Sequence, residues 1–294
     1  SEMCIRDRYI IVAIRKDRWV ANLFYRLADK NTRNGIQIFE DFCKSGHMKE
    51  KDILAMRVLG DDAQIPAYRF ENVLLRKNRR FYNGDESNFV NLFASDYNDD
   101  FPDPFVRADI LNWLYQVQAL SGPTGDKGLF QVSELARSLQ VYGHSLAVIY
   151  RELAYLARKN LVLCENSAMP IEEGDLVKIT IPGALHLQML RNVSYLSACA
   201  EDTLFKNTEV MTRISNRLKF HESDSKLVVA LNARDLVNYL IEYRKEYLTN
   251  SDELVSEKAI ISSVDLNDSL HAVEQWIQAD ENLKKTISEI DYFT

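Results

Sequence analysis

The sequence predicts a mainly α protein whose helices are interrupted by one small β-hairpin. Apolar residues recur at helical spacing over most of the chain, whereas strand-like alternation is clearest at Val177, Ile179 and Ile181. Only 10 Gly and 6 Pro are spread over 294 residues, which favours helices over tight turns. The longest apolar run, residues 9–14, is far shorter than the ~20 residues that cross a bilayer, so no membrane contact is expected.

Composition and charge indicate a globular protein of the cytoplasm. Apolar residues make up 46% and charged residues 27% of the chain, and its length suits about two domains. The net charge of −7 argues against general binding to polyanions, although a local basic patch is compatible with it. Cys43, Cys164 and Cys199 are far apart and outside any CxxC pattern, so we expect reduced thiols and no metal site.

The first eight residues, SEMCIRDR, match no targeting signal. Decoded with one plausible set of codons, they match the end of a transposase-based sequencing adapter. We therefore expect residues 1–8 to be translated adapter and natural sequence to begin near Tyr9. We then also expect the chain to be a fragment that lacks its N-terminal part.

Two amphipathic helices are predicted between residues 16 and 46. In the first, Trp19, Leu23 and Leu27 recur at intervals of four residues, and Ile36, Phe39 and Cys43 do much the same in the second. The second helix is expected to begin at a cap residue, and the candidates are Asn31 and Thr32.

Further helices are predicted over residues 49–59 and within 60–83, the latter ending in a basic cluster. The polar, acidic stretch 83–104 has two prolines near its end and is expected to connect this part to the next.

The clearest pattern lies between residues 104 and 181. Pro104 stands in the first turn of an amphipathic helix, and Ser133 is expected to cap the next one. The expected elements are, in order, a helix, a short strand, two helices and two strands, at 104–120, 129–132, 133–140, 145–161, 161–166 and 175–181. This order predicts a winged helix-turn-helix domain with a small β-hairpin wing.

The expected organisation is a helical lid, a helical connector, a winged helix-turn-helix domain and a helical C-terminal region. The boundaries are 1–8 for the adapter segment, then 9–50, 51–103, 104–195 and 196–294. After the expected wing, further helices are expected within 182–205, 207–220, 233–248 and 268–290.

Two stretches together resemble a known group of proteins. Residues 25–47, YRLADKNTRNGIQIFEDFCKSGH, resemble the helical lid of AAA+ and STAND-type P-loop ATPases, in which a motif like Gly/Ser-Asn-x-Arg-x-Ala/Gly-Leu/Ile begins a lid helix. Here the motif spans 30–36, with Lys30 in place of the small residue. Residues 101–114, the expected winged helix and residues 195–205 look like the C-terminal portion of bacterial members.

This resemblance implies a parent ATPase that binds ATP and Mg²⁺ through a nucleotide-binding domain upstream. The sequence contains no GxxxxGK[ST] phosphate-binding loop, and the stretch at 122–128, GPTGDKG, lacks the GK[ST] ending. We therefore expect this chain to bind no nucleotide alone, and the missing domain to be one of its partners. No nucleophile elbow, HExxH motif or paired His and Cys ligands occur, so no catalytic residue is predicted.

The resemblance implies nucleotide-sensing roles for Arg33 and His186. A guanidinium suits the sensing of a γ-phosphate because it is always charged and binds phosphate oxygens in pairs. The alternative for Arg33 is an exposed arginine at a helix start, paired with Asp29 or Asp41. The alternative for His186 is a surface or partly buried histidine with no ligand.

The third helix of the expected winged helix is a candidate contact surface. It would enter the major groove if the domain bound duplex DNA, and otherwise it would pack or contact a protein partner. Residues 101–195 hold eight Lys or Arg and nine Asp or Glu, and the wing itself is acidic, which weakens the DNA interpretation. A helical scaffold whose tail docks a partner is a third interpretation. The candidate contact residues are Tyr150, Arg151, Tyr155, Arg158 and Lys159.

The basic cluster RKNRRF at 76–81 is the other candidate surface. Its four cations, together with Phe81 and Tyr82, could hold single-stranded nucleic acid or a phosphate. The alternative is the solvated end of a helix, with arginines paired to Asp85 and Glu86. The four cations are Arg76, Lys77, Arg79 and Arg80.

Overall fold

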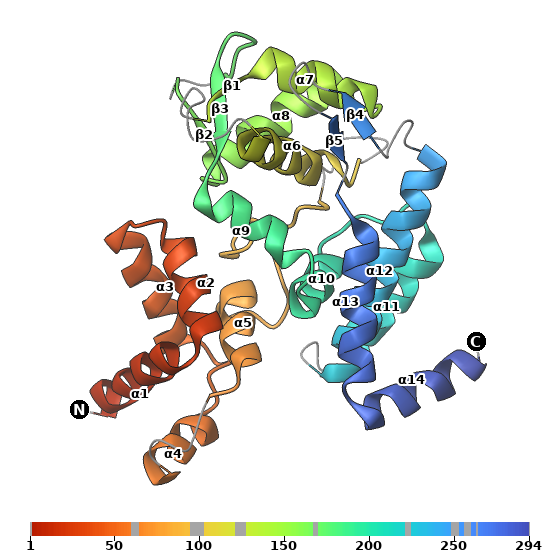
Figure 1. The fold of residues 1–294 in the computed structure, drawn as a ribbon. Coiled ribbons are helices and arrows are strands. Elements are labelled where there is room, and N and C mark those ends of the chain that lie inside the picture. The colour runs from red at the N-terminus through yellow and green to blue at the C-terminus, as the bar shows by residue number, and fades with distance from the viewer. Residues whose placement is uncertain are drawn as a thin grey trace. The chain divides into compact units, whose positions relative to one another are not determined.

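The computed structural model divides into two compact units, Ser1–Val90 and Asn91–Thr294, and is mainly α, as the sequence predicts (Figure 1). The finer predicted domain boundaries stay predictions. The predicted connector partly, and the 122–128 stretch almost wholly, fall outside the residues that the structure describes. Those described residues are 2–59, 65–94, 103–120, 128–166, 170–220, 225–247, 253–255, 260–262 and 264–293.

The first unit is a set of short helices followed by an irregular chain. Helix α1 runs without a break from the segment interpreted as adapter into the following residues, and no helix was predicted there. The fifth helix is much shorter than the 60–83 stretch in which it was expected. The helices are α1 (Glu2–Lys16), α2 (Arg18–Ala28), α3 (Thr32–Lys44), α4 (Glu50–Leu59) and α5 (Ala67–Arg76).

The core of the first unit lies between α2, α3 and α5. The ring of Phe42 stacks on Phe24 at 6.4 Å and meets Phe70 edge-on at 5.3 Å between centroids. The buried side of α3 is formed by Ile38 and Phe42, so the predicted stripe of Ile36, Phe39 and Cys43 is wrong. Ile36 is 57% exposed because α3 turns a different side toward α2 and α5.

The turn between α2 and α3 is fixed by its cap residue and by two left-handed residues. The Asn31 side chain accepts hydrogen bonds from the backbone N–H groups of Arg33 and Asn34, which confirms Asn31 as the cap. Asp29 and Lys30 have φ angles of 48° and 61°. Lys30 therefore adopts a conformation that glycine takes without strain, at the position where the lid motif has a small residue.

The second unit begins with a helix-rich segment around a three-stranded antiparallel sheet. Its elements follow the predicted order of helix, strand, helix, helix, strand and strand. The sheet has the strand order β1-β3-β2, with Phe130 paired to Val177 and Val162 paired to Ile179. The elements are α6 (Val106–Leu120), β1 (Phe130–Gln131), α7 (Val132–Val141), α8 (Leu146–Arg158), β2 (Val162–Cys164) and β3 (Leu176–Ile179).

Two details of this segment differ from the predictions. Helix α7 begins at Val132, so Ser133 lies inside its first turn and does not cap it. The N–H groups of Val132 and Ser133 instead donate to the carbonyls of Asp175 and Glu173 in the chain between β2 and β3. The spacing of Leu146, Ile149, Leu153 and Leu156 predicts one buried face for the helix at 145–161, but Leu146 is 45% exposed.

Where the structure describes the remainder of the second unit, it is helical apart from a small hairpin that was not predicted. Helix α12 is the longest and packs against α10, α11, α13 and α14. None of the helices in the described ranges combines the length and apolar character that crossing a membrane requires. The elements are α9 (Ile181–Met189), α10 (Val193–Glu201), α11 (Thr208–Phe220), α12 (Lys226–Tyr247), β4 (Glu253–Val255), β5 (Ile260–Ser262), α13 (Leu266–Gln278) and α14 (Glu281–Phe293).

Replacing Gly183 by alanine is expected to destabilise the second unit. Gly183 lies in the first turn of α9, where an added Cβ would stand 2.2 Å from the carbonyl oxygen of Leu161. Forcing the two chain segments apart should lower the free energy of unfolding by about 1–3 kcal/mol, measured by urea denaturation.

Gly35→Ala is the matched control. Its Cβ would meet Ala28 and Phe24 at 3.7 Å, an ordinary contact, and alanine favours the helical conformation of α3. This variant should be more stable than the unmodified chain by up to ~1 kcal/mol. Gly183→Ala with unchanged stability would contradict the packing described for α9.

Candidate functional site

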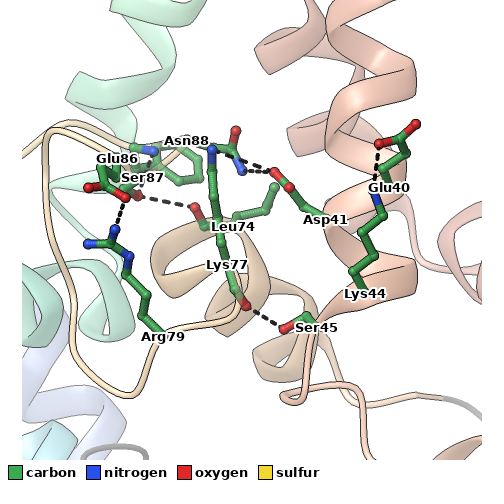
Figure 2. Close-up of polar contacts among 11 residues, drawn as sticks. Glu40, Asp41, Lys44, Ser45, Leu74, Lys77, Arg79, Glu86, Ser87 and Asn88 are labelled. Carbon is green, nitrogen blue, oxygen red and sulfur yellow. Dashed lines mark hydrogen bonds and ion pairs between the residues drawn. The ribbon is translucent and has the colours of Figure 1, made fainter.

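The chain that follows α5, residues 77–90, forms an ordered loop against the end of α3, and it is called the basic loop here (Figure 2). The Ser45 hydroxyl donates to the carbonyl of Lys77, and the Gly46 N–H donates to Asn78 Oδ1 at 3.1 Å. His47 Nε2 lies 2.8 Å from the carbonyl oxygen of Arg79. Backbone contacts therefore hold the basic part of the loop in place.

The far end of the basic loop returns to α3 and α5. Asn88 Nδ2 donates to Asp41 Oδ2 at 3.3 Å, and the Lys77 ammonium lies 3.8 Å from the same oxygen. The Ser87 hydroxyl and the Asn88 N–H both donate to the carbonyl of Leu74, each at 3.1 Å. Figure 2 shows these contacts between the loop and both helices.

Only part of the predicted basic cluster lies at the surface. Arg76 is 2% exposed, and its Nη1 donates to Asn72 Oδ1 at 2.9 Å. Tyr82 is also buried, and its hydroxyl donates to the carbonyl of Phe89 at 2.7 Å. The prediction that Arg76 and Tyr82 form part of a binding surface is therefore wrong for the folded chain.

The exposed members of the cluster are Lys77, Arg79, Arg80 and Phe81. Arg79 forms an ion pair with Glu86, as the alternative interpretation of the cluster predicts. The guanidinium of Arg80 lies over the ring of Phe81 at 4.9 Å from its centroid, and this ring is 42% exposed. An arginine and an aromatic ring are thus presented together to solvent.

Arg33 lies in the first turn of α3 with its side chain exposed. It forms no ion pair with any residue in the described part of the chain. The predicted pairing with Asp41 is absent because that carboxylate contacts Asn88 and Lys77 instead. The guanidinium therefore stands in solvent beside the positive end of the α3 dipole.

Three of the five candidate residues on α8 are held by contacts within the second unit. The Tyr155 ring lies under the guanidinium of Arg107 at 3.9 Å. Arg151 Nε lies 3.1 Å from a carboxylate oxygen of Glu152. Lys159 places its ammonium 5.5 Å from the Tyr155 ring.

The other two candidates, Tyr150 and Arg158, lie toward the outside of α8. Arg158 is exposed and Tyr150 is partly exposed. Partial burial raises the pKa of Tyr150, and the nearby negative charge of Glu173 raises it further. An acidic side chain of the β2–β3 turn therefore influences the outer side of α8.

A buried ion pair lies on the inner side of α8. Arg107 Nε on α6 is 2.6 Å from Glu152 Oε2, and both side chains are less than a tenth exposed. Arg107 also donates from Nη1 to the carbonyl of Asn91 at 3.1 Å. Asn91 in turn donates from Nδ2 to the carbonyl of Cys199 at 3.2 Å. This network joins the start of the unit to α6, α8 and α10.

His186 is wholly buried inside the second unit. Its Nδ1 lies 2.7 Å from the carbonyl oxygen of Pro182, one turn earlier on α9. Burial lowers its pKa to about 4, only partly opposed by this hydrogen bond, so the ring is neutral. The implied nucleotide-sensing role would require α9 to rearrange before a phosphate could reach the ring.

A second histidine, which sequence reasoning missed, joins two carboxylates. His144 Nδ1 contacts Asp103, and its Nε2 lies 2.9 Å from Asp109 Oδ2. Burial opposes the charge, but hydrogen bonds and charges from the two aspartates together raise the pKa of His144 to about 10. The sequence showed only a histidine in the turn before α8, and nothing near it in the sequence identified the two aspartates as its partners.

A groove of about 520 Å³ between α6, α9 and α13 was also not predicted. Its rim carries an ion pair between Arg191 and Asp268, and Tyr115 and Leu187 belong to its lining. No candidate residue from the sequence lies in it. Among the residues with described positions, no group of three or more His, Cys, Asp or Glu side chains could hold a metal ion.

Comparison with protein-family models, with curated protein sequences and with solved structures gave no significant match to this chain.

We predict that the two buried histidines, His144 and His186, make stability depend on pH in opposite directions. The folded-state pKa of His144 is raised, so its stabilisation is complete below pH 6.5 and is lost as pH rises toward 10. The folded-state pKa of His186 is lowered, so stability is lost as pH falls from 6.5 toward 4. The free energy of unfolding, measured by denaturant titration, should fall by roughly 2 kcal/mol between pH 7 and pH 9.

His144→Gln should remove most of this alkaline decline because glutamine carries no titrating proton. His271→Gln is the matched control, since His271 is exposed on α13. The control should keep the decline of the unmodified chain. An equally steep decline in His144→Gln would show that another group causes it.

Proposed function

We propose that this chain is the nucleotide-responsive C-terminal portion of a P-loop ATPase that resembles the AAA+ and STAND groups. Residues 9–50 act as the helical lid, and the segment from α6 to β3 acts as a winged-helix module. ATP and Mg²⁺ bind to a nucleotide-binding domain of the full-length parent, which is the first partner of this chain. The position of Arg33 is the observation that carries the proposal.

Arg33 has the properties that a nucleotide sensor on a lid needs. Its guanidinium is exposed and is paired with no carboxylate in the described ranges. It stands in the first turn of a 13-residue helix whose cap, Asn31, fixes the local backbone. An arginine beside a helix N-terminus favours phosphate because both the side chain and the helix dipole are positive there.

The winged-helix assignment is supported by connectivity. A helix, a strand and two helices precede two strands, and β3 lies between β1 and β2 in the sheet. The chain between β2 and β3 also accepts hydrogen bonds from the first turn of α7. These contacts hold the turn at the sheet edge beside α7 and α8, where a wing would flank a contact surface.

Charge favours a protein partner for this module over duplex DNA. The β2–β3 turn contains Glu172, Glu173 and Asp175, and the charge of Glu173 reaches Tyr150 on α8. DNA phosphates would meet the negative charge of this turn. Leu146 on α8 and Leu163 on β2 are each more than 40% exposed, which suits contact with another protein.

The proposed mechanism is a shift between two arrangements. The lid closes when Arg33 contacts bound nucleotide, and closure changes the surface that the winged-helix module offers to its partner. Nucleotide can shift this equilibrium only as far as it binds one arrangement better than the other. The buried Arg107–Glu152 pair would let α6 and α8 move as one body.

Replacing Arg33 is expected to weaken nucleotide discrimination in the full-length parent. The upstream coding sequence would be recovered from an independent assembly, and the longer protein would be assayed for ATP and ADP affinity. Arg33→Ala should weaken ATP binding by roughly tenfold to a hundredfold and leave ADP binding unchanged, because the lost contact is a charge-assisted bond to the γ-phosphate.

Arg57→Ala on α4 is the matched control, since Arg57 is an exposed arginine of the same unit. It should bind both nucleotides as the unmodified protein does. A complete gene with no phosphate-binding loop upstream would contradict the proposal. So would an ATP affinity of Arg33→Ala equal to that of the unmodified protein.

A further inference from the structure

We propose that the exposed part of the basic loop, Arg79, Arg80 and Phe81, binds a short stretch of single-stranded nucleic acid. This site is independent of the proposed ATPase function. It combines cations for a phosphate backbone with an exposed ring on which an unpaired base can stack.

The distribution of charge between the two units supports this site. Residues 1–90 hold 17 Lys or Arg and 13 Asp or Glu, a formal charge of +4. Residues 91–294 hold 19 and 30, a formal charge of −11. The overall charge of −7 therefore hides a basic first unit, and a polyanion would be attracted to that unit alone.

The geometry of the basic loop supports an aromatic contact as well as an electrostatic one. Phe81 is 42% exposed, and the Arg80 guanidinium already lies over its ring at 4.9 Å. A base that stacks on this pair would gain both stacking and cation–π contact. Paired bases in a duplex cannot present their faces in this way, so the site selects single strands.

The loop is also held in place before any ligand arrives. Ser45, Gly46 and His47 each make a hydrogen bond to the segment 77–79, at the end of α3. Binding therefore orders few additional residues, which lowers the entropic penalty of association.

Arg79 and Arg80 do not lie where a cation would stabilise the dipole of a helix C-terminus. Lys44 and Lys77 lie at the C-terminal ends of α3 and α5, where cations stabilise the helix dipole. Arg79 and Arg80 lie beyond the end of α5. The pair between Arg79 and Glu86 is about half exposed on both sides, so a phosphate can displace the carboxylate at little loss.

The test uses the 294-residue chain with fluorescent oligo(dT) and oligo(U) of about 15 nucleotides, a duplex of the same length, and polyphosphate. Fluorescence anisotropy at low salt should show binding to the single strands. Affinity should fall with salt at a logarithmic slope of about −2, as expected for two or three neutralised phosphates. Preference between the two single strands would show whether DNA or RNA is the ligand.

Two variants separate the electrostatic and stacking contributions. Phe81→Ala should weaken oligonucleotide binding about tenfold with an unchanged salt slope, whereas Phe81→Tyr should retain it. Arg80→Ala should weaken binding and make the slope shallower by about 0.7. Tyr25→Ala is the matched control for an exposed aromatic residue of the same unit and should change nothing.

Three outcomes would overturn the proposal. The first is no binding to single strands at low salt. The second is binding to polyphosphate as tight as binding to the single strands, with no effect of Phe81→Ala. The third is binding to the duplex that is tighter than binding to the single strands. The second outcome would identify a general anion surface, and the third would move nucleic-acid contact to another part of the chain. All three residues to be changed are exposed, so the variants should fold.

Discussion

The buried ion pair between Arg107 and Glu152 is the contact on which the second unit depends. A carboxylate removed from water must be neutralised and hydrogen-bonded, or the fold that buries it is strongly destabilised. Here α6 supplies the cation and α8 the anion, and the same guanidinium binds the Asn91 carbonyl and covers Tyr155. The two helices and the start of the unit therefore have one favourable arrangement. The contacts on the inner side of α8 fix the position of its outer side as well.

The cluster of His144 with Asp103 and Asp109 adds a second polar constraint to the same helices. It joins the turn before α8 to the start of α6, two residues from Arg107. The polar contacts of His144 and Glu152, together with the buried side chains of Ile149, Leu153 and Leu156, hold α8 against α6. A module built in this way can transmit a displacement as a body, which is what the proposed coupling to a lid requires.

Local patterns in the sequence were enough to predict the order of elements from α6 to β3 and to name Asn31 as one of two cap candidates. These features depend on residues that are near one another in the chain. The burial of Arg76 and the partners of His144 could not be predicted in the same way, because Asp103 lies 41 residues from His144. Leu146 was misplaced for a related reason: its spacing fits the buried stripe, but it lies in the first turn of α8 and is left exposed. Arg33 was singled out by its place in the lid-like motif at 30–36, and the basic cluster at 76–81 by residue type alone.

A double-mutant cycle on Arg107 and Glu152 tests this account most directly. Arg107→Met and Glu152→Leu should each lower the free energy of unfolding by about 3–5 kcal/mol, since each removes the buried partner of a buried charge. The double variant should be destabilised by much less than the sum of the two effects. Single effects below about 1 kcal/mol that simply add would contradict a central role for this pair.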